Sequence, residues 1–486
     1  MTITQKALLE SVPTGLLIGG QWRDASGGAR FDVTDPSSGS TLLTCADATS
    51  EDGLAALAAA DEAQPGWAAT PPRERGEILR AAFEAVTARS DELALLMTLE
   101  MGKTLAESAG EVTYGAEFLR WFSEEAVRIR GQYAVAPNGA TRLLTMRQPV
   151  GPTLMITPWN FPLAMGTRKI APALAAGCTM VVKPAAETPL TMLLLAQILQ
   201  ECGVPPGVLN VVTTTDSGGV CEPVIRDPRL RKLTFTGSTA VGKVLVEQSA
   251  EQLLRLSMEL GGNAPFLVFE DADVEEAVDG AMLAKMRNLG EACTSANRFI
   301  VHESLAEDFS RRLAERRGAL VVGKGTKKGV DVGPLITEKA RDGVHALVED
   351  AVGRGARLLT GGEPVPGRGN FYAPTVLADV PEGSRCLTEE IFGPVAPVTT
   401  FTDEDEAVRR ANDTEYGLVG YLYTADQKRV LRVAEKMQFG MVGVNTGIVS
   451  NPAAPFGGVK HSGYGREGGA EGIEEYLEVK YLGLAT

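Results

Sequence analysis

Cys293 is the residue in this sequence whose type and setting could form a covalent bond to a substrate. It lies in NLGEACTSANR, a stretch of small residues between a predicted helix and the predicted strand 298–301. Loops of this kind present nucleophiles, and a thiol becomes strongly nucleophilic once it loses its proton. A lone cysteine is more often a buried structural thiol, so other residues must decide between the two interpretations.

Two other kinds of cysteine chemistry find little support. The chain has three histidines, His302, His345 and His461, and none lies in a glycine-rich motif suited to the base of a thiol hydrolase. The cysteines are isolated from one another, and neither HExxH nor a paired Cys/His spacing occurs. We therefore predict no metal site and no protease-like Cys/His pair.

Glu259 and Asn160 could supply the acid–base and electrostatic parts of a thiol reaction. Glu259 precedes a Gly-Gly pair in SMELGGNAP, and a carboxylate withdrawn from bulk water there would have a raised pKa and could take a proton from water. Asn160 follows the predicted strand 153–157, where its amide could donate to an oxyanion together with the backbone N–H of Cys293. Taken alone, Glu259 is typical of a surface residue, and Asn160 of a turn between two prolines.

Glycines and a lysine at the ends of two predicted strands could hold a phosphorylated cofactor. GSTAVG (237–242) follows a strand and precedes a helix, so the chain could turn tightly beside a pyrophosphate at the N-terminus of that helix. The segment is not a GxGxxG motif, and glycine-rich turns from strand to helix are common. Lys183, which ends the predicted strand 179–183, could pair with a phosphate or a ribose, although a lysine in that place is more often only solvated.

Alternating strand and helix patterns must position these residues. A helical region over 73–130 comes first, with Ser90 placed to cap the helix that ends before Gly102. Two series of short β-rich runs separated by helical segments follow, and this alternation predicts two α/β units with parallel sheets. The first series comprises 153–157, 179–183, 209–213 and 233–237. The second comprises 266–269, 298–301, 320–323, 375–380, 418–423 and 441–445.

Two further predicted strands, 141–148 and 475–484, lie outside both series. Strands without neighbours leave backbone N–H and C=O groups unpaired, which is costly. We therefore expect a small β arm that pairs with another subunit.

The composition favours a multidomain protein that acts on small molecules. A chain of 486 residues is longer than one hydrophobic core usually serves, and ~150 residues per domain suggest about three structural units. The formal net charge of −15 disfavours nucleic acids and acidic membrane surfaces as partners. Six scattered cysteines, with neither an export signal nor an apolar run long enough to cross a membrane, predict a cytoplasmic protein.

Seven motifs, in their order along the chain, resemble the aldehyde dehydrogenase superfamily over almost the whole sequence. They are TPWNFP, VVKPAAETP, FTGSTAVG, MELGGNAP, GEACTSANR, EEIFGPV and PFGGVKHSGYGRE. The resemblance implies an α/β fold with a Rossmann-type cofactor domain, an α/β catalytic domain and a small β oligomerisation arm. It implies Cys293 as the nucleophile, Glu259 as the general base and Asn160 as the oxyanion donor. It also implies contacts to an NAD(P) cofactor from Thr157, Trp159, Lys183, Ala186, Gly237, Ser238, Glu390 and Phe392.

Several segments look most like succinate-semialdehyde dehydrogenases within that superfamily, among them NFPLAMGTRK, KMRNLGEAC and GIVSNPAAPFGG. The resemblance implies that Arg168, Arg287 and Ser450 hold the distal carboxylate of the substrate, since guanidinium groups bind carboxylates through charge-assisted hydrogen bonds. Either arginine could instead form a structural ion pair. Glutarate semialdehyde is the nearest alternative substrate, because one methylene changes selectivity by only ~1–3 kcal/mol.

Two positions depart from the pattern of this branch. Ser295 stands where many members carry a second cysteine two residues after the nucleophile, so a disulfide switch is not available there. Ala186 stands where NAD-preferring relatives often carry a glutamate that binds the ribose hydroxyls. Without that carboxylate a 2′-phosphate meets less repulsion and can pair with Lys183, so we expect NADP to be preferred over NAD.

The resemblance also divides the chain. The cofactor-binding domain is expected over 1–126 and 149–258, the catalytic domain over 259–465, and the arm over 127–148 and 466–486. A homodimer or homotetramer is expected.

Two alternative functions stay open. One is a non-catalytic binding protein on the same fold, against which the presence of Cys293, Glu259 and Asn160 argues. The other is a CoA-acylating dehydrogenase, which Glu259 disfavours because it would activate water in place of CoA.

Overall fold

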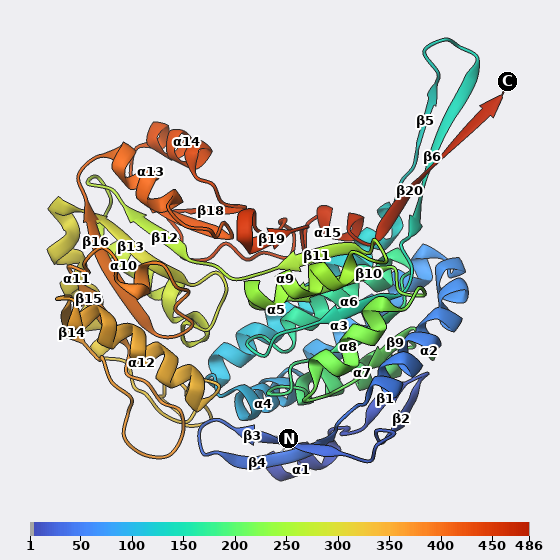
Figure 1. Ribbon diagram of the computed structural model, residues 1–486, viewed down its shortest axis with the longest axis horizontal. Coiled ribbons are helices and arrows are strands. Elements are labelled where there is room, and N and C mark those ends of the chain that lie inside the picture. The colour runs from blue at the N-terminus through green and yellow to red at the C-terminus, as the bar shows by residue number, and fades with distance from the viewer. Residues whose placement is uncertain (1–3, 486) are drawn as a thin grey trace.

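The computed structural model of this protein describes residues 4–485. Two α/β units each contain a mainly parallel β-sheet, and a narrow three-stranded arm projects from the first unit (Figure 1). The predicted α/β class, with two large sheets and a separate small one, is confirmed.

The first sheet contains eight strands in the order β19-β11-β10-β7-β8-β9-β1-β2. The five strands from β11 to β9 are parallel, and helices connect them. All four predicted strands of the first series are present. The bounds are β7 (Thr153–Ile156), β8 (Met180–Lys183), β9 (Leu209–Val211), β10 (Lys232–Thr236) and β11 (Arg255–Glu259), with β1 (Leu16–Ile18), β2 (Gln21–Arg23) and β19 (Gly463–Tyr464) at the edges.

Helices cover both faces of the first sheet because successive strand residues point to opposite sides. Met155 of β7 packs into one core, whereas Leu154 and Ile156 pack into the other. The first core is closed by α3 (Pro72–Ala88), α4 (Ser90–Met101), α5 (Leu105–Glu125), α6 (Ala164–Ala176) and α7 (Leu190–Glu201). The second core is closed by α2 (Ser50–Ala69), α8 (Ser217–Arg226) and α9 (Thr239–Ser249).

The predicted helical region 73–130 is confirmed as the helices α3, α4 and α5, but the prediction for Ser90 is wrong. The N-cap of α4 is Arg89, no side chain caps this helix, and Ser90 is its first helical residue. Since α3 ends only two residues earlier, the chain turns directly from one helix into the next. The helix α4 ends at Gly102, whose φ of 98° suits glycine.

The second sheet has the order β14-β15-β16-β13-β12-β17-β18, and only β14 is antiparallel to its neighbour. The predicted strand 320–323 is wrong, because only Val322 forms an isolated bridge, to Val332. The bounds are β12 (Ala264–Val268), β13 (Ala296–His302), β14 (Arg357–Thr360), β15 (Thr375–Ala378), β16 (Val395–Phe401), β17 (Val419–Tyr423) and β18 (Met441–Val444). The surrounding helices are α10 (Val274–Met286), α11 (Glu303–Gly318), α12 (Glu338–Gly353), α13 (Glu404–Asn412) and α14 (Gln427–Lys436).

The arm consists of β5 (Gln132–Val135), β6 (Thr141–Pro149) and β20 (Leu477–Ala485). Both predicted strands exist, but β6 pairs with β20 and with β5 of the same chain. The expectation that these strands need another subunit to pair their backbone N–H and C=O groups is therefore wrong, because they pair with one another. The outer edges of β5 and β20 stay without a neighbouring strand in the described chain.

Smaller elements complete the fold. Near the N-terminus, α1 (Gln5–Ser11) precedes a hairpin of β3 (Arg30–Asp35) and β4 (Ser40–Ala46), and α15 (Glu471–Glu474) precedes the last strand. Within residues 4–485, no helix combines the length and the apolar character needed to cross a membrane.

Candidate active site

Three adjacent parallel strands of the first sheet end at one edge and bring three predicted residues together. Asn160 follows β7, Gly237 follows β10, and Glu259 is the last residue of β11. The order of the strands reverses between β7 and β10, since β7 leads to β8 on one side and β10 leads to β11 on the other. Ligands of open α/β sheets bind at such a reversal point, outside the carboxyl ends of the strands.

The second unit contributes Cys293 on a loop whose backbone is held at several points. The loop starts at Asn288 and Leu289, whose φ angles of 53° and 61° turn the chain away from the end of α10. The Asn288 N–H donates to Glu107 Oε1 over 2.6 Å, and its side-chain Nδ2 donates to the carbonyl of Glu291 over 2.9 Å. A loop fixed in this way presents its thiol in one position.

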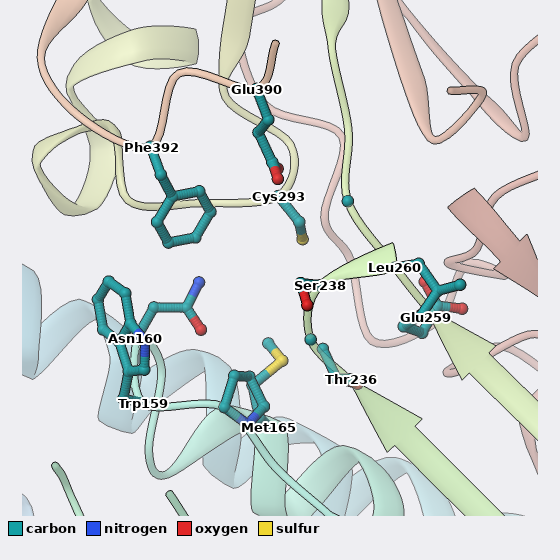
Figure 2. A pocket seen from close by; sticks show the side chains of 13 residues that line it. Trp159, Asn160, Met165, Thr236, Ser238, Glu259, Leu260, Cys293, Glu390 and Phe392 are labelled. Carbon is teal, nitrogen blue, oxygen red and sulfur yellow. The ribbon is translucent and has the colours of Figure 1, made fainter. Parts of the chain in front are cut away.

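Cys293 lies at a cavity of about 200 Å³ between the two units. Figure 2 shows Cys293, Glu390 and Phe392 on one side of this cavity, opposite Trp159 and Asn160. Eight predicted residues line it: Trp159, Asn160, Gly237, Ser238, Glu259, Cys293, Glu390 and Phe392. Sequence reasoning missed five other lining residues: Pro158, Met165, Thr236, Leu260 and Gly261. Three of the five, Pro158, Thr236 and Leu260, adjoin predicted residues in the same motifs, so proximity in sequence could have found them.

A second, much smaller cavity of about 10 Å³ also contains Cys293 and Met165 in its lining. All three predicted substrate residues, Arg168, Arg287 and Ser450, line it. The thiol therefore stands between two cavities, one next to the predicted cofactor residues and one next to the predicted substrate residues. Sequence reasoning missed the remaining lining residues, which are Tyr114, Phe161, Thr294 and Phe456.

The Cys293 thiol is held in its neutral form by its surroundings. Burial, together with the charges of Glu259 and Glu390, raises its pKa to about 12 against the opposing effect of Arg168 and Arg287. A neutral thiol is a weak nucleophile, so a nearby base has to remove its proton before it attacks a carbonyl.

Asn160 has one side-chain donor available at the cavity. Its Nδ2 donates to the backbone carbonyl of Glu291 over 3.0 Å, and an amide nitrogen has two hydrogens. Its Oδ1 is buried without a hydrogen-bond partner in the described chain. The second N–H of this amide can therefore donate to an oxygen that develops negative charge beside Cys293.

Glu259 is a buried carboxyl group within reach of other charges. Burial raises its pKa well above the usual value, the neighbouring carboxylate Glu467 raises it further, and Arg168 and Lys169 act in the opposite direction. Its Oε2 has no hydrogen-bond partner among the described residues. A carboxyl group with a raised pKa and a free oxygen is suited to accept and return a proton near neutral pH.

Glu467, which sequence reasoning missed, binds two cations beside Glu259. Its carboxylate lies 2.5 Å from Arg168 Nη2 and 2.5 Å from Lys169 Nζ. Arg168 also lies over the ring of Phe456, 4.0 Å from the centroid. The alternative that Arg168 forms a structural ion pair therefore describes this structure, although the guanidinium also lines the smaller cavity. The glycine-rich motif around Glu467 resembles the family's motif, but nothing in its sequence predicts the ion pairs with Arg168 and Lys169.

Arg287 differs from Arg168 because no carboxylate binds it among the described residues. Its Nη1 donates to Ser450 Oγ over 3.2 Å, and its guanidinium lies 5.4 Å from the Tyr114 ring and 5.2 Å from the Phe161 ring. Most of its N–H groups are thus available to an anionic ligand in the smaller cavity.

The cofactor residues that line the larger cavity form a polar and aromatic wall. Glu390 Oε1 accepts from Gly262 N–H over 3.0 Å, and burial raises the pKa of Glu390 to about 7. Phe392 packs edge-on against Trp159 with 5.4 Å between ring centroids. Ser238 is the N-cap of α9, so the positive end of this helix faces the cavity.

Three predicted cofactor residues lie outside both cavities, where β7 and β8 end at the same edge of the sheet: Thr157, Lys183 and Ala186. Lys183 ends β8 and is buried, so the alternative of a merely solvated lysine is wrong. Burial lowers its pKa, and its Nζ donates to Ser217 Oγ over 2.8 Å. Thr157 N–H donates to the Lys183 carbonyl over 3.1 Å, which joins the ends of β7 and β8.

Residues 4–485 contain no group of three or more His, Cys, Asp and Glu side chains that could hold a metal ion. The absence of a metal from the functional protein stays a prediction.

Comparison with known proteins gives the family. The model of the aldehyde dehydrogenase family matches residues 22–482. A succinate-semialdehyde dehydrogenase of Paenarthrobacter nicotinovorans is 63% identical over 444 residues, 91% of this chain and 99% of the relative. A glutarate-semialdehyde dehydrogenase of Pseudomonas putida is 48% identical over 469 residues, 96% and 97% of the two chains. The crystal structure of an E. coli NADP-dependent enzyme superposes with a TM-score of 0.97 at 47% identity and covers 98% of each chain. This chain belongs to the aldehyde dehydrogenase family.

Proposed function

We propose that this protein oxidises succinate semialdehyde to succinate with NADP as the preferred cofactor. The observation that carries the proposal is the place of Cys293, between a cavity lined by predicted cofactor residues and a cavity lined by Arg287. The similarity to a succinate-semialdehyde dehydrogenase at 63% identity supports the choice of substrate.

The chain's own residues account for each proton and each charge in the reaction. Glu259 accepts the Cys293 proton, and the thiolate adds to the aldehyde carbon. The second N–H of Asn160 donates to the resulting oxyanion, a contribution of roughly 2.7–4 kcal/mol for one such donor. A bound nicotinamide supplies the hydride acceptor, and loss of the hydride leaves a thioester on Cys293. Glu259 releases the Cys293 proton to solvent and then takes a proton from water, whose oxygen attacks the thioester. The Cys293 thiolate leaves the acyl carbon, the acid is released, and Glu259 returns its proton to the sulfur.

The smaller cavity favours a short aldehyde with a carboxylate at its far end. Arg287 and Ser450 present hydrogen-bond donors there, and this cavity shares Cys293 with the larger one. A carboxylate bound by Arg287 would direct the aldehyde end of the chain towards the thiol. Glutarate semialdehyde is the second candidate, because a glutarate-semialdehyde dehydrogenase is 48% identical to this chain.

The residues at the sheet edge fit a phosphorylated dinucleotide. Gly237 leaves no room for a side chain, since a Cβ there would lie 2.4 Å from the Phe235 ring. Thr236 Oγ1 is buried at the cavity without a partner among the described residues, and Ser238 starts the helix α9. Ala186 has no carboxylate to repel a 2′-phosphate, and Lys183 ends the neighbouring strand. This combination supports NADP over NAD.

The proposed domain division corresponds to the sheets. Residues 1–126 and 149–258 would form the cofactor-binding domain, residues 259–465 the catalytic domain, and residues 127–148 with 466–486 the arm. The strands β12 to β18 all belong to the second sheet, which supports the middle range. The short strand β19 pairs with β11 and adds one segment of that range to the first sheet.

The arm is proposed to pair two copies of the chain in a homodimer, alone or within a homotetramer. Its three strands project away from both units (Figure 1), and large apolar side chains such as Tyr133 and Tyr481 are 65% and 60% exposed there. Exposed apolar side chains together with an open strand edge favour association with another β-rich surface.

A steady-state assay across an aldehyde panel tests the proposed function. The panel contains succinate semialdehyde, glutarate semialdehyde and butanal, each with NADP⁺ and with NAD⁺, in the presence and absence of CoA. We expect the highest kcat/KM for succinate semialdehyde with NADP⁺ and free succinate as the product. A higher kcat/KM for butanal would contradict the substrate proposal, a higher value with NAD⁺ would contradict the cofactor preference, and a CoA thioester product would contradict hydrolysis.

A further inference from the structure

A buried ion pair contacts the main chain of Asn160. Lys103 and Glu111 are both fully buried, with 2.5 Å between Lys103 Nζ and Glu111 Oε2. Lys103 Nζ also donates to the carbonyl of Asn160 over 2.8 Å and lies over the Phe161 ring, 4.4 Å from its centroid. Burying two charges is costly, and apolar replacements of such pairs are often as stable. Stability alone therefore does not explain why both charges stand here.

The second oxygen of Glu111 holds the other end of the same segment. Glu111 Oε1 accepts the N–H groups of Leu163 and Ala164 over 2.9 and 3.0 Å. These N–H groups belong to the start of α6, which has no side-chain cap of its own. The ion pair therefore holds the short segment 160–164 at both ends. Lys103, which lies just before α5, binds the first residue, and Glu111 on α5 binds the last two.

The same helix also holds the loop that carries Cys293. Glu107, one turn before Glu111 on α5, accepts the N–H of Asn288 over 2.6 Å. Asn288 Nδ2 donates to the Asn160 carbonyl over 3.1 Å as well as to the Glu291 carbonyl. In Figure 2 the amide nitrogen of Asn160 points towards the loop of Cys293, where it donates to Glu291. One element therefore holds both the nucleophile loop and the oxyanion donor.

We propose that Lys103 and Glu111 are positioning residues that orient the Asn160 amide towards the oxyanion formed on Cys293. The Asn160 carbonyl accepts from both Lys103 and Asn288, which fixes the peptide plane from which the side chain extends. Donors to an oxyanion act only within a narrow range of distance and angle. The inference rests on the proposed function, since it needs a tetrahedral intermediate at Cys293.

The test combines a neutral-pair variant with removal of the donor itself. Lys103→Met with Glu111→Gln removes both charges and the donor to Asn160 while it keeps the volume, so no unpaired charge stays buried. Asn160→Ala removes the amide, and a triple variant carries all three changes. Lys324→Met is the matched control, because it breaks another Lys–acid pair, with 2.8 Å to Asp35, away from both cavities.

The readout is the rate of the first NADPH burst after rapid mixing with succinate semialdehyde, together with the Kd for NADP⁺. We expect the neutral-pair variant to slow the burst about ten- to hundredfold without a change in this Kd, because one misplaced donor is enough for such a loss. Asn160→Ala should slow it ~10²–10³-fold. The triple variant should be no slower than Asn160→Ala, since the pair acts through that amide.

Two results would overturn the inference: a neutral-pair variant with an undiminished burst, or a triple variant slowed by the product of the two separate losses. Should the neutral-pair variant fail to fold, Lys103→Arg, which keeps the charge but displaces the donor to Asn160, gives the same comparison in the presence and absence of Asn160→Ala. A wild-type protein that oxidises no aldehyde would instead contradict the proposed function, so the two failures differ.

Discussion

At the scale of single residues, the reaction depends on two groups that are both protonated at low pH. Burial raises the pKa of the Cys293 thiol to about 12 and raises the pKa of Glu259 well above its usual value. Only the ionised carboxylate can accept the thiol proton. The rate should therefore increase as the pH rises through the pKa of Glu259 and Glu259 loses its proton.

The first prediction concerns the acid limb of the pH–rate profile, the range in which the rate rises with pH. In the wild-type protein, kcat/KM should rise with pH at values above those where an ordinary glutamate ionises, because burial raises the pKa of Glu259 and that ratio follows the ionisation of groups in the free enzyme. In Glu259→Gln the thiol ionises without a base, so the limb should move to higher pH and kcat should fall ~10²–10⁴-fold. Steady-state rates from pH 5 to 9 measure both quantities. An unchanged limb in Glu259→Gln would rule out Glu259 as the base.

The second prediction separates the two arginines of the smaller cavity. Arg287→Ala should lower kcat/KM for succinate semialdehyde by about 10- to 100-fold, since a charge-assisted hydrogen bond contributes ~1.5–3 kcal/mol. The value for butanal, which has no carboxylate, should change little. Arg287→Lys is the matched control because it keeps the charge, and it should restore part of the loss. Equal losses for both aldehydes would show that Arg287 does not bind the distal carboxylate.

At the scale of elements, the cofactor preference depends on the end of β8 and the loop after it. Lys183 ends that strand, and Ala186 lies three residues later without a carboxylate. The pKa of Lys183 is lowered by burial, so an approaching phosphate would favour its charged form.

The third prediction is that Ala186→Glu reverses the preference. A carboxylate there would repel a 2′-phosphate and accept hydrogen bonds from the free ribose hydroxyls of NAD. We expect the ratio of kcat/KM for NADP⁺ to that for NAD⁺ to fall at least about tenfold, or ~1.4 kcal/mol. Ala186→Gln, of the same size without the charge, should change the ratio much less. Equal effects of the two substitutions would exclude the charge as the cause.

The sequence predicted best the features that depend on short periodic segments. The hydrophobic strands β7, β8 and β10 are predicted from their own residues; Lys183 ends β8, and Asn160 and Gly237 follow β7 and β10. The strand β11 is not predicted because its sequence, RLSME, contains only two apolar residues and lacks the apolar run of the other strands. The predicted strand 320–323 has the same apolar character as a true strand, but no neighbouring strand extends alongside it.

Partners that come together only in three dimensions were not predicted. Glu467 reaches Arg168 and Lys169 across about three hundred residues of sequence, and Lys103 reaches Asn160 from the connection between α4 and α5. A single buried Lys or Glu in a sequence is indistinguishable from a surface residue. Of the eleven predicted binding residues, five line the larger cavity: Trp159, Gly237, Ser238, Glu390 and Phe392. The role of Arg168, by contrast, depends on a partner that the sequence did not indicate.

At the scale of the whole molecule, the arm leaves its apolar side chains uncovered. Val479 and Tyr481 on β20 are 57% and 60% exposed. Burial of such side chains against a second copy would stabilise a dimer by about 25 cal/mol per Å² of apolar surface removed from water.

The fourth prediction concerns this exposed surface. Val479→Glu combined with Tyr481→Glu should shift the protein to a smaller assembly, because two charges would be buried in the proposed interface. Light scattering after size exclusion measures the molar mass. Leu253→Glu, at an 89% exposed position outside the arm, is the control and should leave the mass unchanged. A wild-type protein that is monomeric, or a double variant with the wild-type mass, would contradict the proposed role of the arm.

The fifth prediction concerns the thioester, on which the proposed reaction depends. Glu259→Gln should form the acyl-enzyme and hydrolyse it slowly, so rapid acid quench after mixing with NADP⁺ and succinate semialdehyde should trap it. Mass spectrometry of the digested protein should then show one succinyl group on the peptide that contains Cys293, and Cys293→Ser should show none and should form no NADPH. NADPH formation without any acyl group on Cys293, or at an undiminished rate in Cys293→Ser, would contradict covalent catalysis by this thiol.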